Sequence, residues 1–265
     1  MEKVKQNLTG LLNRVPEITI YFWIIKILGT TIGETAADFL SFNLHLGLVN
    51  TSYIMSCLLA VVLVIQFKLK RYVPAVYWIA VVLISIVWTL ITDQMVEGLG
   101  ISLVTTTIAF SVALTVVFVL WYISEKTLSI HSIYTAKRET FYWLTILFTF
   151  ALGTASWDLL SEGFGIGYLQ AGLLFAWTIA LISILFYYFK TKQFKFQINA
   201  IFAFWSAYIL TRPLGASIGD YLTQAPKYGG LGISTVWISA IFFIAIVGLV
   251  NFLSIKQKNQ TIIDA

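Results

Sequence analysis

Four aspartates recur at a fixed distance from a tryptophan, and this pattern is the one in the chain best suited to chemistry. Each aspartate follows its tryptophan by fifteen residues, in the pairs Trp23/Asp38, Trp78/Asp93, Trp143/Asp158 and Trp205/Asp220. The chain has five aspartates, so this register holds all but one of them. Carboxylate oxygens are the ligands that hard ions such as Mg²⁺, Ca²⁺ and Mn²⁺ prefer, and they also bind protons. The four aspartates therefore predict a site for a cation.

The segments that carry these aspartates are apolar enough to span a membrane. The 265-residue chain is 59% hydrophobic and 11% charged, whereas soluble domains are roughly a quarter charged. Charged side chains within spanning segments are costly and are by default candidates for a functional site. Two carboxylates ~8 Å apart repel by about 2 kcal/mol at an effective dielectric near 20, so four of them need shared protons or a bound cation.

Eight apolar segments, each about 20 residues long as a ~30 Å hydrocarbon core requires, follow a polar start. Lipid leaves backbone groups without water, and the runs lack the alternation of strands, so we expect helices. We place the spans at residues 18–40, 48–67, 74–95, 101–122, 140–160, 166–189, 198–222 and 233–253.

The spans pair into four two-helix repeats within a transmembrane domain of residues 17–255. The repeats cover about 18–67, 74–122, 140–189 and 198–253, and polar cytoplasmic segments 1–16 and 256–265 flank the domain. Two spans per unit give every copy the same orientation, so we predict parallel repeats with pseudo-symmetry about the membrane normal. One unit cannot bury its apolar face alone, so the four are expected to close on each other. The predicted fold class is an all-α membrane protein of eight transmembrane helices.

Basic residues gather on one side of the predicted membrane. Lysines and arginines precede the first span and follow every second one, whereas the links on the other side hold a single basic residue, Lys227. By the positive-inside rule both termini are cytoplasmic, in a multi-pass protein of the cytoplasmic (inner) membrane. The net charge of +5 lies in these short loops, so we expect the lipid bilayer as a partner and no nucleic acid. The sequence is compatible with a homo-oligomer.

The four helices that carry the aspartates all run outward from the cytoplasm, so their carboxylates share one depth in the outer third. Fifteen residues rise ~22 Å and place each aspartate about 60° around from its tryptophan. If these helices line the middle of the bundle, the carboxylates form a ring.

Other charged residues accompany the ring. Glu34 lies one turn before Asp38 on the same face, Lys26 lies two turns deeper, and Arg212 belongs to the fourth copy. Lys26 and Arg212 either compensate acids in a polar core or modulate the protonation and occupancy of those acids. Glu97 and Glu162 follow two of the ring aspartates by four residues, so they are expected to extend an acidic outer vestibule.

Further polar and small residues suggest packing or additional ligands. His45 and the run Thr105-Thr106-Thr107 could add a nitrogen and hydroxyls to the site. Pro213 either kinks its helix and frees a carbonyl or is tolerated within a packed bundle. The pairs Gly29/Gly33 and Gly215/Gly219 predict close helix approach. The four tryptophans are interpreted as interfacial anchors or packing residues.

The chain resembles a bacterial family of membrane proteins built from four tandem repeats of unknown function. The resemblance is carried by Trp23, Trp78, Trp143 and Trp205, together with the segments KILGTTIGETAADFL, YWLTILFTFALGTASWDLL and TRPLGASIGDYL. It covers nearly the whole chain, and the second copy is the most divergent. It implies the fold and the number of repeats, and it supplies no activity.

The sequence leaves three classes of function. The first is a transporter or channel for a small cation, a divalent metal or a proton-coupled ion, bound by Asp38, Asp93, Asp158 and Asp220 with Glu34. A bound Mn²⁺, Mg²⁺ or Ca²⁺ is the cofactor to consider. The second is a non-transporting scaffold, sensor or partner subunit whose acids are structural. A membrane-embedded enzyme is the third, and we expect none because no nucleophile and base stand together in the sequence.

Overall fold

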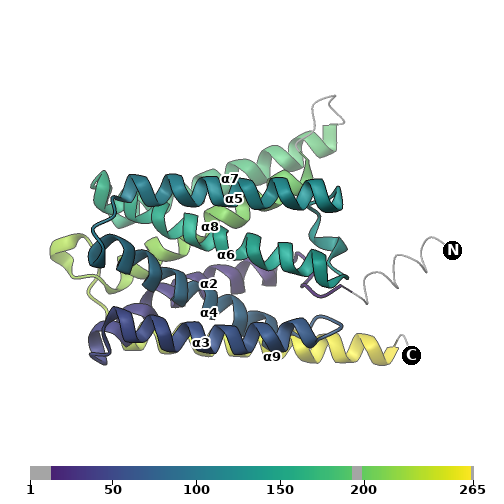
Figure 1. The fold of residues 1–265 in the computed structure, drawn as a ribbon, viewed down its shortest axis with the longest axis horizontal. Coiled ribbons are helices and arrows are strands. Elements are labelled where there is room, and N and C mark those ends of the chain that lie inside the picture. Colours follow the sequence, from purple (N-terminus) through teal and green to yellow (C-terminus); the bar gives the residue numbers. More distant parts are fainter. Residues whose placement is uncertain (1–12, 193–198, 264–265) are drawn as a thin grey trace.

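The computed structural model describes residues 13–192 and 199–263, and most of these are helical (Figure 1). The long helices are α2 (Ile20–Asp38), α3 (Gly47–Lys68), α4 (Pro74–Asp93), α5 (Leu103–Glu125), α6 (Ala136–Asp158), α7 (Tyr168–Lys192), α8 (Ala200–Thr223) and α9 (Thr235–Ile263). Their bounds lie close to the eight expected segments, so the all-α prediction is confirmed for the described part of the chain. Parts of the predicted terminal segments, 1–12 and 264–265, lie outside it.

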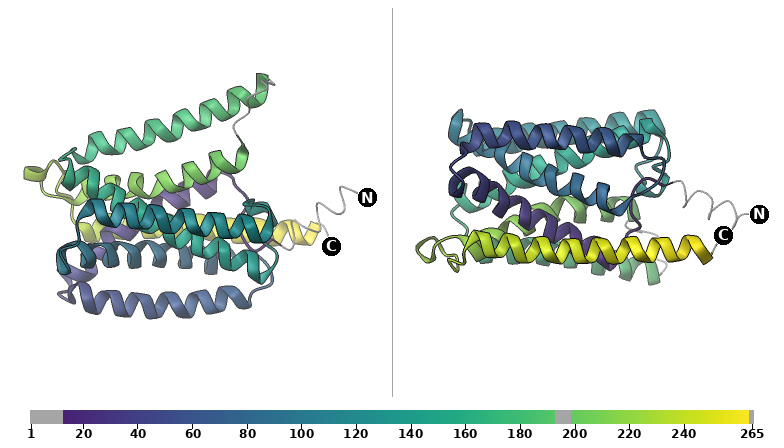
Figure 2. Two further views of the ribbon diagram at one scale, coloured as in Figure 1. Left: turned by 45° about the horizontal axis from the view of Figure 1, so that its top comes forward. Right: turned by 90° about the horizontal axis from the view of Figure 1, so that it is seen from below.

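Helices α2, α4, α6 and α8 form the inside of the bundle. Helix α2 packs against α4 and α8, and α6 packs against the same two, so the four close into a circle. Each remaining helix covers the inner helix of the next repeat: α3 lies on α4, α5 on α6 and α7 on α8. Helix α9 lies on α2 and completes the arrangement. In the left view of Figure 2, α3 and α7 run along opposite sides of the bundle.

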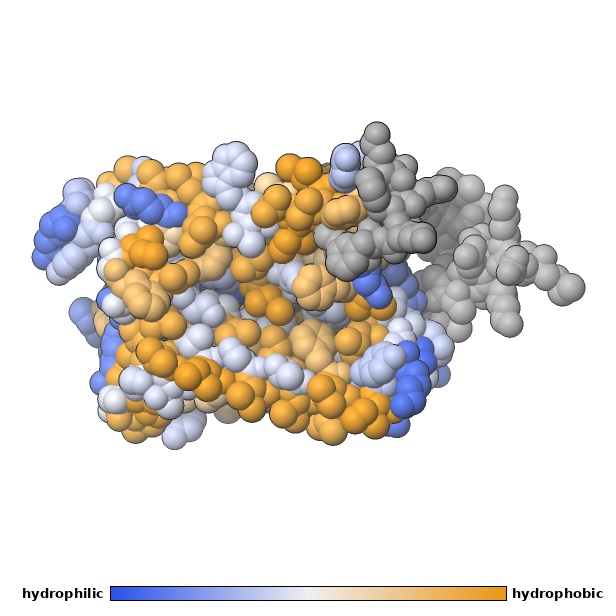
Figure 3. Space-filling view, turned by 90° about the horizontal axis from the view of Figure 1, so that it is seen from above, coloured by the Kyte–Doolittle hydropathy of each residue, from blue (hydrophilic) through white to orange (hydrophobic). Residues whose placement is uncertain are grey.

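Burial separates the two sets of helices. In its most apolar stretch α4 is 67% buried, whereas α7 is 11% buried. The outer helices present large apolar side chains outward, among them Trp177, Ile184 and Ile244. Figure 3 shows apolar side chains over the middle of one face and hydrophilic ones toward its two ends. A surface of this kind suits a lipid bilayer.

Six of the described helices are long and apolar enough to cross a membrane: α3, α4, α5, α6, α7 and α9. Helices α2 and α8 are not among them, because the first carries Lys26, Glu34 and Asp38 and the second carries Arg212 and Asp220. Both are inner helices, so their polar side chains face the bundle. The structure thus supports a multi-pass membrane protein.

Tryptophans and their aromatic neighbours fill the end of the bundle at which the described chain begins and ends (Figure 1). Trp78, Trp143 and Trp205 are buried, and Trp205 Nε1 donates a 3.0 Å hydrogen bond to the Leu128 carbonyl. The ring before each tryptophan, such as Tyr77, points to the same cluster. Of the two interpretations of these residues, packing is the one that the structure favours.

Proline 213 does not break its helix. Helix α8 is a single α-helix through this residue, which agrees with the second interpretation, a proline tolerated within a packed bundle. Hydroxyl groups support the backbone around the proline, since Thr211 Oγ1 donates to the Tyr208 carbonyl at 2.6 Å and Thr30 Oγ1 donates to the Thr211 carbonyl at 3.2 Å. Packing against neighbouring helices and such hydroxyl bonds is how membrane helices tolerate proline.

Glycines let the inner helices approach each other closely. A methyl group on Gly33 would lie 1.8 Å from Ser85 Oγ, and one on Gly215 would lie 1.9 Å from Thr30 Oγ1. These contacts join α2 to α4 and α8 to α2. The packing role predicted for the glycine pairs is confirmed at these two positions, whereas a methyl on Gly29 would meet only an ordinary contact at 3.5 Å.

We expect Gly215→Ala to destabilise the bundle by about 1–3 kcal/mol, the usual cost of overpacking. The backbone of α2 at Thr31 lies 3.0 Å from the added methyl, so a rotamer change alone cannot relieve the clash. Gly248→Ala on α9 is the matched control, because its methyl would meet open space. Thermal unfolding of the purified proteins in one detergent measures both. Equal melting temperatures for the two variants would contradict the close α2–α8 packing.

Candidate functional site

Three of the inner helices change their winding directly after the predicted aspartate. Helix α2 ends at Asp38, α4 at Asp93 and α6 at Asp158, and each continues into a five-residue π-helical segment. These segments are η1 (Phe39–Asn43), η2 (Gln94–Gly98) and η4 (Leu159–Gly163). Helix α8 instead continues as an α-helix past Asp220 to Thr223. Single π turns inside helices are rare and often occur at functional sites.

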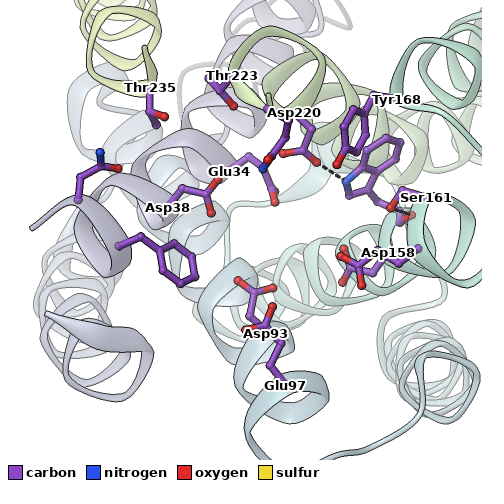
Figure 4. Close-up of a pocket in the computed structure, with 15 residues that line it drawn as sticks. Glu34, Asp38, Asp93, Glu97, Asp158, Ser161, Tyr168, Asp220, Thr223 and Thr235 are labelled. Atoms are coloured by element: carbon purple, nitrogen blue, oxygen red, sulfur yellow. Dashed lines mark hydrogen bonds between the residues drawn. The ribbon is translucent and has the colours of Figure 1, made fainter. Parts of the chain in front are cut away.

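The four aspartates line one cavity of about 360 Å³ at the end of the bundle opposite to the tryptophans. Figure 4 shows their side chains coming from four different helices toward the same space. Glu34, Glu97 and Glu162 line it as well. The structure therefore brings together all five acids proposed as ligands and both acids proposed for a vestibule.

The charge of this cavity has one sign. Seven of the twelve acidic residues of the chain line it, and among the residues that the structure describes no lysine, arginine or histidine does. Carboxylates that share a space in a low-dielectric setting repel each other unless protons or cations neutralise them. The carboxylates of the cavity therefore need protons or cations to neutralise them.

Other polar side chains complete the wall. Trp157 Nε1 donates a 2.7 Å hydrogen bond to Asp220 Oδ2, drawn as a dashed line in Figure 4. Asp220 is only 7% exposed, whereas Asp38, Asp93 and Asp158 are half-buried. The remaining lining residues are Phe42, Asn43, Ser161, Tyr168, Thr223, Gln224 and Thr235. Sequence reasoning missed them, although the position of Trp157 directly before an aspartate was a usable signal.

The carboxylates share the cavity without converging on one point. Within residues 13–192 and 199–263, no group of three or more His, Cys, Asp or Glu side chains is arranged to hold a metal ion. Direct coordination of a bare ion by several aspartates would need these side chains to move inward. A cavity of about 360 Å³ also leaves room for an ion that keeps part of its water shell, as Mg²⁺ usually does.

An ion pair forms the floor of the cavity. Arg212 Nη2 donates to Glu34 Oε2 at 2.7 Å and to Thr89 Oγ1 at 2.5 Å. The arginine is fully buried, while the glutamate also lines the cavity. Charge compensation, one of the two roles considered for Arg212, thus has a defined partner.

Lys26 lies below this floor and is fully buried. Its Nζ lies 3.8 Å from the centre of the Phe150 ring and 4.4 Å from the centre of the Tyr208 ring. It makes no hydrogen bond within the part of the chain that the structure describes. A cation over aromatic faces gains some stabilisation, but Lys26 does not compensate an acid directly.

Two of the suggested additional ligands lie elsewhere. His45 is exposed in the link between η1 and α3 and does not line the cavity. The hydroxyls of Thr105, Thr106 and Thr107 bond to Ser102 and to backbone carbonyls, including that of Ala155. The three threonines therefore do not contribute to the site, because their hydroxyls form hydrogen bonds to neighbouring backbone and side-chain groups instead.

Each pair of one inner and one outer helix matches a known sequence repeat. The Repeat of Unknown Function (DUF347) matches at residues 21–72, 76–127, 141–192 and 203–259. The chain belongs to the DUF347 family. No curated protein and no solved structure matches it. The four DUF347 units confirm the resemblance to four tandem repeats, and they cover most of α2–α3, α4–α5, α6–α7 and α8–α9 in turn.

The Glu34–Arg212 pair predicts an asymmetric response to substitution. Glu34→Gln should lower the free energy of unfolding by about 3–5 kcal/mol, because it leaves the buried guanidinium of Arg212 without a counter-charge. Arg212→Met should lower the free energy of unfolding by less than Glu34→Gln does, since Glu34 lines the cavity and water can reach it there. The double variant should regain most of the loss. Denaturant unfolding in mixed micelles measures all three proteins, and Glu97→Gln on the exposed wall is the control. Additive losses in the double variant would contradict a direct pair.

Proposed function

We propose that this DUF347 protein moves a small cation across the cytoplasmic membrane, and that the acidic cavity is the binding site. The cation is a divalent metal such as Mn²⁺, Mg²⁺ or Ca²⁺, or an ion whose movement is coupled to protons. The observation that carries the proposal is a cavity with seven carboxyl groups and no basic side chain among its described lining residues. Rings of acidic side chains are one way in which membrane proteins select cations.

All eight long helices span the membrane in this proposal, including α2 and α8. The outer helices and the neighbouring inner helices shield these two from lipid, so their charged side chains need not face hydrocarbon. The four repeats are then related by pseudo-symmetry about the membrane normal. Because the basic loops lie at the end opposite to the cavity, both termini are cytoplasmic and the cavity opens outward.

The floor of the cavity supplies a mechanism for passage. A cation that enters beside Glu34 competes with Arg212 for the same carboxylate, whose oxygen lies 2.7 Å from the guanidinium. Arginine cannot lose its proton, so the competition is purely electrostatic. Occupancy by the ion weakens the contact that joins α2 to α8 and favours a rearrangement of the inner helices. Such a change in the balance between two packings is how ligands drive transport cycles.

The contrasting reading, a scaffold with structural acids, predicts carboxylates paired with Lys26 and Arg212 in a dry core. Of the cavity acids, only Glu34 forms an ion pair within the described part of the chain. The four aspartates have no basic partner there and line the cavity instead, which supports ion binding over a structural role.

The orientation can be tested with single cysteines in a Cys57→Ser background. Lys227→Cys lies in the link near the cavity, and Lys137→Cys lies at the opposite end, and both positions are exposed. A membrane-impermeant maleimide should label residue 227 in intact cells and residue 137 only after lysis. The reverse pattern would place the cavity on the cytoplasmic side.

Asp158→Asn should slow cation flux at least tenfold in liposomes, because it removes one charge from the cavity wall without changing the size of the side chain. Uptake of Mn²⁺, Mg²⁺ and Ca²⁺ is followed for the wild type and the variant at equal reconstitution. Glu17→Gln is the matched control, since Glu17 is exposed, precedes α2 by three residues and does not line the cavity. Equal flux in Asp158→Asn and wild type would remove this aspartate from the mechanism.

A further inference from the structure

The carboxyl groups of the acidic cavity stand apart from one another. Within residues 13–192 and 199–263, no three acidic, histidine or cysteine side chains are placed to ligate one ion, although seven carboxyl groups line the space. Direct ligation of Mg²⁺ or Ca²⁺ requires oxygens within about 2.0–2.6 Å of the ion. An ion held through its own water molecules lies roughly 4 Å from the protein oxygens, because each contact includes a water. The spread of the carboxylates fits this second geometry.

The volume of the cavity also suits an ion that keeps its water. Six water molecules at ~30 Å³ each, the shell of an octahedral ion, take up about 180 Å³. The cavity measures about 360 Å³, so it can hold such a complex together with further waters. A bare divalent ion would fill only a small part of this space.

Two of the carboxylates have one oxygen engaged by the protein itself. Trp157 Nε1 donates to Asp220 Oδ2 at 2.7 Å, and Arg212 Nη2 donates to Glu34 Oε2 at 2.7 Å. The other oxygen of each carboxylate accepts no hydrogen bond from a residue that the structure describes, and Asp220 lines the cavity although it is only 7% exposed. While these bonds persist, neither carboxylate can chelate a bare ion with both oxygens, as Ca²⁺ ligands often do. Each can still accept a hydrogen bond from a water molecule on an ion.

Two hydroxyl groups of the wall are placed to accept hydrogen bonds (Figure 4). Ser161 Oγ donates its proton to the Trp157 carbonyl at 2.9 Å, and Thr223 Oγ1 donates to the Gly219 carbonyl at 2.9 Å. A hydroxyl has one proton and two lone pairs, so both oxygens offer only lone pairs to the cavity. A water molecule bound to a divalent cation turns a lone pair to the metal and donates its protons outward. The wall therefore presents the acceptors that such a water needs.

We propose that the cavity binds a divalent cation of the Mg²⁺ type together with most of its water shell, and that hydrogen bonds from these waters make the contacts to the protein. This inference rests on the proposed function and narrows its substrate to strongly hydrated divalent ions. Asp220 and Glu34 each accept through the free oxygen, and Ser161 and Thr223 accept through their lone pairs. Contacts of this kind are nearly as favourable in enthalpy as direct hydrogen bonds.

Binding through water selects between ions by how firmly they hold their shell. Mg²⁺ gives up its waters reluctantly and usually keeps several when it is bound, whereas Ca²⁺ takes about six to eight oxygens directly. The cavity accepts Mg²⁺ without stripping it and offers Ca²⁺ few direct ligands. We therefore expect the purified protein to bind Mg²⁺ about tenfold more tightly than Ca²⁺.

Hexaamminecobalt(III) is a direct probe of this mode of binding. The complex has the octahedral shape and the outward-pointing donors of hydrated Mg²⁺, and its ammonia ligands do not exchange during the measurement. In calorimetry of the purified protein in detergent, it should bind and compete with Mg²⁺ for the same site. Binding of Mg²⁺ or Ca²⁺ that the cobalt complex does not displace would overturn the inference.

The waters that a bound ion retains can be counted with Mn²⁺, which shares the octahedral oxygen coordination of Mg²⁺. Electron spin echo spectra of the Mn²⁺ complex in D₂O measure the number of water molecules on the metal. We expect about four or more of them. A smaller number would show that the carboxylates ligate the metal directly, and would overturn the inference while leaving the proposed function standing.

Substitutions of the two hydroxyls separate water-mediated contacts from attraction by charge alone. Ser161→Ala and Thr223→Val remove an acceptor and no charge, so each should weaken Mg²⁺ and hexaamminecobalt(III) severalfold and in parallel. Ser183→Ala and Thr115→Val are the matched controls, because these hydroxyls donate to carbonyls in the same way on exposed faces of α7 and α5. Unchanged binding in both cavity variants overturns the water-mediated contacts. No binding of Mg²⁺, Mn²⁺, Ca²⁺ or hexaamminecobalt(III) by the wild type overturns the proposed function and this inference with it.

Discussion

A charge in a low-dielectric interior is tolerated only where something compensates it, and this constraint explains how the bundle is organised. Helices α2 and α8 carry most of the buried charge and lie inside, covered by outer helices with apolar surfaces. The deepest arginine has its counter-charge in Glu34. Within the described helices, the acids without a basic partner line one cavity. Each charged residue thus lies at a place in the bundle where the free-energy cost of burying its charge is reduced.

The four repeats share one helical hairpin, and the residues that differ between them form the ion pair below the aspartates. The aspartate register is the same in all four repeats, so it places four carboxylates at one level. One turn deeper, the same register holds Glu34 in the first copy and Thr89 in the second. Two turns below the aspartates, the fourth repeat has Arg212. Because these residues differ, the floor closes with a single ion pair whose members come from the first and last repeats.

Periodicity made much of this architecture predictable. Apolar length located the helices, and the fixed interval from tryptophan to aspartate was enough to place four acids on one side of four helices. The features that the sequence did not reveal depend on contacts between helices. The continuity of α8 through Pro213, the π turns after three aspartates, and the hydrogen bond from Trp157 to Asp220 arise from tertiary packing, which a single sequence does not encode locally. His45, which could have added a ligand, does not line the cavity, because nearness in sequence does not imply a shared direction.

The central claim is that the carboxylates of the cavity hold a positive ion, and anomalous diffraction from crystals of the purified protein soaked with Mn²⁺ tests it most directly. The account predicts an anomalous peak inside the cavity, within reach of the side chains of Asp38, Asp93, Asp158 and Asp220. An empty cavity beside well-occupied sites elsewhere on the protein, with the aspartates hydrogen-bonded to one another or turned toward lipid headgroups, would contradict it.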